Sequence, residues 1–116
     1  MDFVLRLIIS SLAVLVTAYL MPGVTVDTGL TAILVAAVLS LLNAIVKPIL
    51  VFLTIPITLV TMGIFLLFIN AFIILLVDRI VPGFQVSSFW TAFFFSIILS
   101  LVMAIFEGLA RKRREE

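Results

Sequence analysis

The chain contains no cysteine and no histidine. The absence of cysteine excludes disulfide bonds and thiolate metal sites, and the absence of histidine removes the commonest general base and metal ligand. No carboxylates are paired within a hydrophobic run, no nucleophile stands beside a base, and no glycine-rich phosphate loop is present. The sequence therefore predicts a protein that is not an enzyme and holds no metal or cofactor.

Charged residues are also scarce. They make up 11% of the chain, whereas hydrophobic residues make up 66% and include 11 phenylalanines. A water-soluble domain of this length buries only about 60–70% of its chain surface, which is too little to hide so many apolar side chains. A lipid bilayer would cover them instead, so the composition indicates an integral membrane protein.

Proline and glycine divide the chain into four apolar runs, at about 3–21, 30–46, 57–77 and 89–106. A helix needs about 17–25 apolar residues to cross the hydrocarbon core, and all four runs meet that length. Alternation of polar and apolar residues is absent, which disfavours strands. The sequence predicts an all-α membrane protein with four transmembrane helices. We expect the first run to be retained as a span, because no signal-peptide cleavage site precedes a polar region.

The distribution of basic residues predicts the orientation. With four spans the termini share a side, and every basic residue except Arg79 falls on it, which marks that side as cytoplasmic. We therefore expect a multi-pass protein of the bacterial inner membrane with both termini in the cytoplasm. The terminal cluster is expected to contact anionic lipid at about 1 kcal/mol per residue, and nucleic acid is not an expected partner. The basic residues on this side are Arg6, Lys47, Arg111, Lys112, Arg113 and Arg114.

The chain resembles itself at an offset of 60 residues: residues 22–26 align with 82–86, and Thr31-Ala32 with Thr91-Ala92. Each unit holds two spans, so the units run the same way and predict a pseudo-two-fold axis along the membrane normal. The expected single domain comprises repeat 1 (about 3–46), a joint (47–56), repeat 2 (about 57–108) and a basic tail (109–116). The joint is bounded by Pro48 and Pro56, and either it lies at the membrane interface or the second helix continues through Pro48 with a kink.

Small residues four positions apart mark one face of the second span and one face of the fourth. Such stripes allow membrane helices to approach closely, so these two spans are expected to cross, and copies of the chain to self-associate. The alternative is that small residues are simply common in membrane helices. The outer loops 24–26 and 84–86 read as short extended segments that are expected to pair as a ribbon. The stripes are Ala36, Ser40 and Ala44, and Ser96, Ser100 and Ala104.

Four polar residues are candidate functional groups, and Pro48 and Pro56 of the joint are candidate functional or packing residues beside them. Lys47 and Glu107 occupy equivalent positions in the two repeats, at the inner ends of two spans. Asn43 lies one turn before Lys47. Lys47 and Glu107 either form an ionic latch, or Lys47 reaches to lipid phosphates while Glu107 begins the polar tail. Asn70 lies near the middle of the third run, where an amide needs a partner. It is expected either to make an interhelical hydrogen bond or to line a polar path or ligand site.

A series of short motifs lies between residue 42 and residue 90. They are Leu42-Asn43, Lys47-Pro48-Ile49-Leu50, residues 53–58, residues 61–63, Asn70-Ala71, and residues 82–86 with Phe89-Trp90. In these motifs the chain resembles the four-span phage holin family, superfamily IV type. The resemblance implies a small bacterial membrane protein whose holin-like members form oligomers that open membrane lesions. It also implies a connection of some members with envelope stress.

Two other classes compete with this interpretation. The first is a small channel or transporter, such as a four-span multidrug exporter or a fluoride channel. An exporter of that kind needs an acidic residue inside the first span, which this chain lacks, and a dual-topology channel conflicts with the charge bias. The second is an accessory subunit or scaffold of a larger membrane complex, which the sequence leaves open.

Overall fold

The computed structural model describes residues 3–115, with side chains as far as residue 112. The described chain is almost entirely helical. Its elements in order are α1 (Phe3–Leu20), β1 (Val24–Val26), α2 (Gly29–Leu53), α3 (Ile55–Val60), α4 (Phe65–Ile80), β2 (Phe84–Val86) and α5 (Phe89–Glu115).

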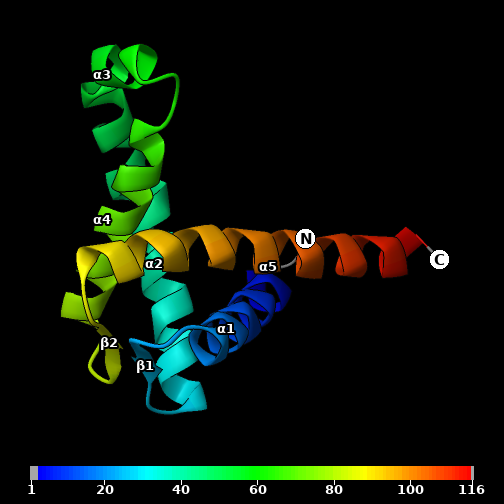
Figure 1. The fold of residues 1–116 in the computed structure, drawn as a ribbon. Coiled ribbons are helices and arrows are strands. Elements are labelled where there is room, and N and C mark those ends of the chain that lie inside the picture. The colour runs from blue at the N-terminus through cyan, green and yellow to red at the C-terminus, as the bar shows by residue number, and fades with distance from the viewer. Residues whose placement is uncertain (1–2, 116) are drawn as a thin grey trace.

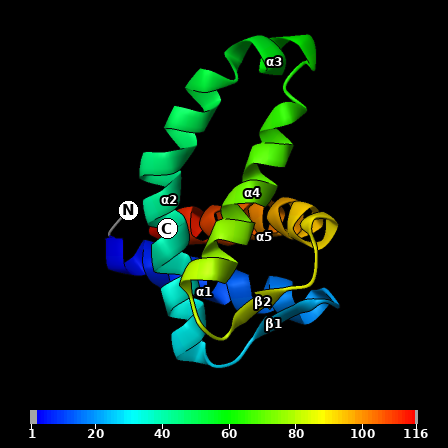
Figure 2. The same cartoon turned by 90° about the vertical axis from the view of Figure 1, so that its left-hand side faces the viewer.

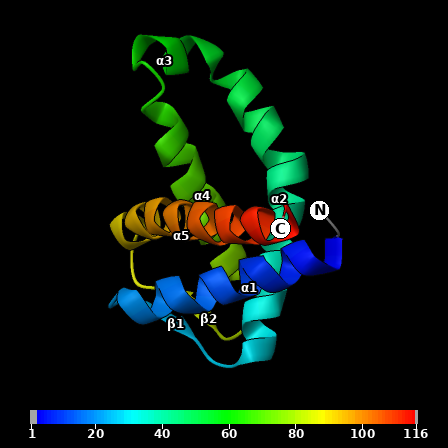
Figure 3. The same ribbon diagram turned by 90° about the vertical axis from the view of Figure 1, so that its right-hand side faces the viewer.

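The helices form two arms that cross near a short ribbon of strand (Figure 1). In the first arm α2 and α4 pack antiparallel, and α3 joins their far ends. In the second arm α1 and α5 pack against one another and run in opposite directions (Figures 2 and 3), and the C-terminal part of α5 extends beyond the start of α1 (Figure 1). The arms contact one another through α1 against α2 and α4 against α5.

The ribbon pairs β1 with β2 in antiparallel register, with Thr25 opposite Gln85. The sequence-based expectation that the two outer loops pair is thus confirmed. Hydrogen bonds extend the ribbon at both ends: the backbone N–H of Asp27 donates to the carbonyl of Gly83 at 3.0 Å, and that of Ser87 donates to the carbonyl of Gly23 at 2.9 Å. The two bonds are equivalent at an offset of 60 residues, because Asp27 corresponds to Ser87 and Gly23 corresponds to Gly83.

The starts of α2 and α5 are capped in the same way. The hydroxyl oxygen of Thr28 accepts from the backbone N–H of Thr31 at 3.1 Å, and that of Ser88 accepts from Thr91 at 3.3 Å. In each pair the two hydroxyl groups are also hydrogen-bonded to one another. Hydroxyl caps satisfy amides that a helix start leaves free, which explains why both helices begin where they do.

Gly23 and Gly83 make the turns into the ribbon possible. Both have positive φ angles, +92° and +90°, that residues with a β-carbon rarely adopt. A β-carbon would also lie 2.7 Å from the Ser87 hydroxyl oxygen at the first site and 3.1 Å from the Asp27 carboxylate at the second. The preceding Pro22 and Pro82 end the helices because proline cannot continue them.

The core lies where the arms cross, next to the ribbon. Phe84 and Phe95, whose ring centroids are 5.8 Å apart, are its largest fully buried side chains. Small residues allow the close crossings, because a methyl side chain lets two helix backbones approach. The alanines with no exposed surface are Ala13, Ala32, Ala71 and Ala92.

The third expected span, at 57–77, is not one helix. Its first part belongs to α3, and a turn at residues 61–64 separates that helix from α4. Met62 and Gly63 have φ angles of 57° and 89°, which interrupt the right-handed helix. The 16 residues of α4 extend about 24 Å, less than the roughly 30 Å of a hydrocarbon core.

The second and fourth helices are longer than their apolar runs. α2 continues through Pro48 to Leu53, and the position of this segment relative to the membrane interface stays a prediction. Pro56 stands in the first turn of α3, where the N–H that proline lacks would have no helical acceptor. Within the described residues, three helices are long and apolar enough to cross a membrane, namely Phe3–Leu20, Gly29–Leu53 and Phe89–Lys112. The fourth crossing stays a prediction.

Candidate functional site

A cleft of about 620 Å³ lies between α1, α2 and α5, on the inner side of the crossing arms. Its lining changes along each helix from polar side chains to buried apolar ones. At intervals of about one helical turn, or roughly 5 Å, α1 contributes Arg6, Ser10 and Val14, and α2 contributes Asn43, Ser40 and Ala36. α5 contributes Glu107 and, two turns away, Ser100 and the adjacent buried Leu99. We call the end with Arg6, Asn43 and Glu107 the mouth level, the three serines the middle level, and Val14, Ala36 and Leu99 the floor.

The mouth level carries a cation, an amide and an anion. Arg6 and Asn43 are exposed and Glu107 is half-buried. Among the described residues, none of these three side chains makes a hydrogen bond or an ion pair within the chain. Groups of this kind are satisfied by water in an aqueous site, but in a hydrocarbon environment they need another partner.

The middle level consists of hydroxyl groups. Ser100 donates to the carbonyl oxygen of Ser96 at 2.9 Å, a back-bond that is common for serine in membrane helices. Ser40 is exposed to the cleft, whereas Val14 and Ala36 at the floor are buried. The cleft is therefore amphipathic, with charge at the mouth and an apolar floor next to the core.

The predicted stripes of small residues lie along this cleft rather than against one another. α2 and α5 make almost no direct contact. Ala36 and Ser96 are buried, but the remaining members are exposed, and all of these line the cleft: Ser40, Ala44, Ser100 and Ala104. The spacing identified residues on one helix face correctly, but it carries no information on whether a neighbouring helix covers that face.

The small residues that are fully buried in the core are others, namely Ala13, Ala32, Ala71 and Ala92. Ala32 and Ala92 directly follow Thr31 and Thr91, whose backbone N–H groups donate to the caps, and their match at an offset of 60 residues was the available signal. Ala13 and Ala71 have no spacing pattern that distinguishes them from exposed alanines in so apolar a sequence.

Lys47 and Glu107 form no ion pair within the chain. Lys47 lies on the part of α2 next to α3, and Glu107 lies on the C-terminal part of α5, so they belong to different arms (Figure 1). Pro48 follows Lys47 on α2 and Pro56 lies on α3, and neither proline lines the cleft. The structure brings Glu107 to the cleft but not Lys47.

Asn70 lies half-buried on α4. Its side-chain amide makes no hydrogen bond with any other described residue, so the expected interhelical bond is not formed within one chain. The equivalent position on α1 is Ser10, which lines the cleft.

The model of the family described as "Mycobacterial 4 TMS phage holin, superfamily IV" matches residues 1–105. The chain belongs to this phage holin family. It is 36% identical to an uncharacterized protein of Streptomyces coelicolor over 111 residues, which cover 87% of this chain and 89% of the relative. It is 38% identical to the uncharacterized membrane protein YvlD of Bacillus subtilis over 87 residues, 73% of each chain. No solved structure matches the chain.

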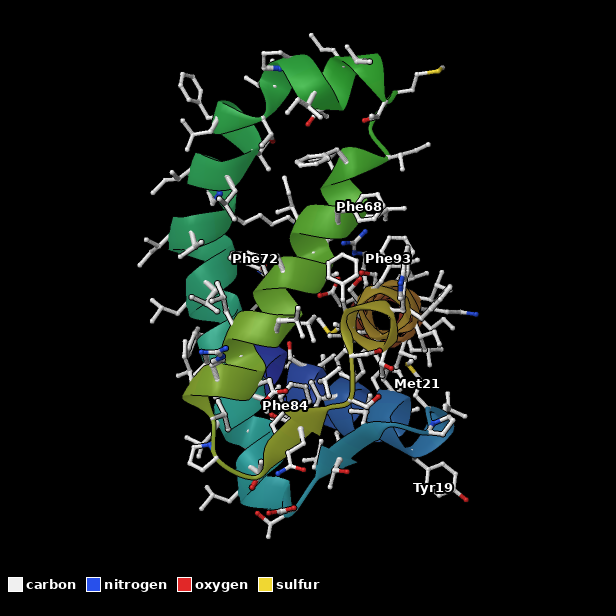
Figure 4. All side chains as sticks on the ribbon, turned by 60° about the vertical axis from the view of Figure 1, so that its left-hand side comes forward. Tyr19, Met21, Phe68, Phe72, Phe84 and Phe93 are labelled. Carbon is white, nitrogen blue, oxygen red and sulfur yellow. The ribbon has the colours of Figure 1, made fainter. Side chains whose placement is uncertain are left out.

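This holin-family chain is an integral membrane protein, and its outer surface is apolar. Between α4 and α5 a cluster of aromatic rings is packed, in which Phe68 lies 5.3 Å from Phe93 and 5.9 Å from Phe89 between ring centroids (Figure 4). Trp90 joins this cluster and remains 59% exposed. Tyr19 points away from the body of the protein (Figure 4). Exposed aromatics of this kind suit contact with lipid near a membrane interface.

The basic tail of the holin-family chain forms the last turns of α5. Arg111 and Lys112 are exposed, as contact with anionic lipid requires. The side chains of Arg113 and Arg114 lie outside the described residues.

Proposed function

We propose that this protein is a non-enzymatic, holin-like component of the bacterial inner membrane that alters envelope integrity or permeability by self-association. The observation that carries the proposal is the amphipathic cleft. Among the described residues, Arg6, Asn43 and Glu107 at its mouth make no hydrogen bond or ion pair, although α1, α2 and α5 are long and apolar enough to span a membrane. Another copy, lipid or water must therefore cover them, and a protein that brings such a surface into a bilayer weakens the barrier there.

The proposed topology has four crossings with both termini in the cytoplasm. Its support is the charge bias, with Arg79 as the one basic residue on the outer side. In this placement α4 is the fourth crossing and α3 lies at the inner interface. α3 exposes Leu59 and Val60, and the turn after it exposes Met62, apolar side chains suited to insertion beside the lipid headgroups.

We further propose that the chain is a tandem duplication with a pseudo-two-fold axis along the membrane normal. The matched caps of α2 and α5 and the matched bonds at the two ends of the ribbon support it. Such an axis passes through the Thr25–Gln85 pair, and the ribbon then faces the periplasm while the mouth of the cleft faces the cytoplasm.

Self-association is proposed to use the uncovered small residues along the cleft, of which Ala44 and Ala104 are exposed. Small residues allow helix backbones of neighbouring copies to approach, and the hydroxyls of Ser40 and Ser100 supply hydrogen bonds worth about 0.6–2 kcal/mol each in membranes. Copies that meet along this face would place their polar mouths around a shared path.

Expression in a bacterium, with simultaneous recording of membrane potential and dye leakage, tests this function. We expect abrupt depolarisation, together with oligomers on cross-linking. The double substitution Ser40→Leu/Ser100→Leu fills the cleft and should abolish both effects. The control Leu101→Phe adds volume on the exposed outer side of α5 and should leave them unchanged. An absence of leakage, with copurification of a larger membrane protein, would instead support the accessory-subunit alternative.

A further inference from the structure

We propose that the cleft binds one phospholipid whose headgroup carries both a phosphate and a primary amine, as phosphatidylethanolamine does. The inference rests on the membrane placement in the proposed function but not on lesion formation. Its basis is the order of chemistry along the cleft, which matches the order of chemistry along such a lipid.

The mouth supplies the charges. The guanidinium of Arg6 projects from α1 and the carboxylate of Glu107 from α5, and neither is paired with another described residue. A planar guanidinium binds phosphate through paired, charge-assisted hydrogen bonds. A carboxylate accepts hydrogen bonds from an ammonium group, which donates three. The amide of Asn43 on the opposite wall can both donate and accept.

The deeper levels match the rest of the lipid. The hydroxyls of Ser10 and Ser40 lie one turn below the mouth, at the depth of the glycerol esters, which are hydrogen-bond acceptors. Below them the apolar floor suits the start of the acyl chains. With the mouth toward the cytoplasm, this polarity has the direction of a lipid in the inner leaflet, headgroup outward and chains toward the midplane.

The opposite charges of Arg6 and Glu107 also predict which lipid headgroup the cleft prefers. A purely anionic headgroup such as phosphatidylglycerol would gain the contact with Arg6 but would meet the Glu107 carboxylate without an ammonium group to neutralise it. The volume of about 620 Å³ lies within the range of small-ligand pockets. In a monomer, the bound lipid would be the partner of the polar groups at the mouth. In an oligomer, water or another copy of the chain would take that role.

The test is a binding titration of the purified, delipidated full chain in detergent with short-chain phosphatidylethanolamine and phosphatidylglycerol. We expect phosphatidylethanolamine to bind more tightly. Arg6→Gln should weaken both lipids about tenfold, since hydrogen bonds to charged groups are lost. Glu107→Gln should weaken phosphatidylethanolamine alone and remove the preference. The matched control Arg79→Gln removes a charge at the end of α4, outside the cleft, and should change neither affinity.

Four outcomes would overturn the inference: equal affinities for the two lipids, a preference for phosphatidylglycerol, unaltered binding in Arg6→Gln, or binding of free phosphoethanolamine as tight as that of the lipid. Circular dichroism confirms that each variant is folded, and Glu107→Gln is read as a change of preference, which misfolding does not produce. If the wild type depolarises cells but shows no lipid preference, this inference fails alone. If it binds selectively but causes no leakage, the proposed function fails alone.

Discussion

The two halves of the protein share a backbone plan but differ in how their outer faces are filled. Between α4 and α5 the space is occupied by packed aromatic rings, whereas between α1 and α2 an apolar groove of about 290 Å³ remains. The groove includes Ile8, Gly29 and Ile33, and the residues 60 positions later are Phe68, Phe89 and Phe93. The caps and turns that define the backbone are therefore compatible with quite different side-chain volumes.

The core shows the same difference at two fully buried positions. Phe95 lies on α5 where α2 has Val35, and the exposed fraction of both is 0%. Truncating a buried phenylalanine typically costs about 3–5 kcal/mol, because lost transfer free energy adds to the cavity left behind. Phe95→Ala should therefore lower the free energy of unfolding by about that amount, and Val35→Ala by clearly less. Reversible unfolding in mixed micelles measures both.

A smaller effect is expected at the turn glycines. Gly83→Ala should cost about 1–2 kcal/mol, since alanine is strained at positive φ. Gly23→Ala should cost more, because its β-carbon would meet the Ser87 hydroxyl oxygen at 2.7 Å. The same unfolding assay provides the comparison. Adding Ser87→Ala should recover part of the loss at Gly23 and none at Gly83. Equal costs at the two sites would show that the close contact relaxes without penalty.

The smallest expected effect is a gain from filling the groove. Ile33→Phe installs on α2 the ring that α5 carries at Phe93, and it should raise the free energy of unfolding by about 0.5–1 kcal/mol, because aromatic side chains contribute packing beyond buried area. Leu34→Phe, on the exposed surface of the same helix, is the matched control and should change little. A loss of stability in Ile33→Phe would indicate that the groove is too narrow for a ring.

Sequence reasoning predicted the helical class, the ribbon and the family, because these depend on local signals. Pro22-Gly23 and Pro82-Gly83 mark turns wherever they occur, and the Thr31-Ala32 and Thr91-Ala92 matches locate helix starts. The break at Met62-Gly63 was missed, because the apolar run continues through it and one glycine in a membrane helix is ordinary. Hydropathy indicates whether a segment is compatible with lipid, but it does not indicate whether one helix continues through that segment.

The candidate site was predicted only in part. Ser40, Asn43, Ser100 and Glu107 were singled out by polarity and spacing, and the structure gathers them at one cleft. Arg6 was assigned only to the charge bias, because its place opposite Glu107 depends on the antiparallel pairing of α1 with α5. Which helices become neighbours depends on tertiary packing, which no local pattern encodes.

The ribbon joins the two arms at one end. Their opposite ends, at α3 in the first arm and at the start of α1 in the second, lie apart. A change in the angle between the arms would therefore pivot about the ribbon, near Thr25 and Gln85. α2 is about 37 Å long, so a tilt of about 5° moves its far end by about 3 Å. Because the mouth of the cleft lies toward the open ends, its width follows the angle between the arms. We therefore expect the width of the mouth to respond to bilayer thickness, because membrane helices tilt to match the hydrocarbon core.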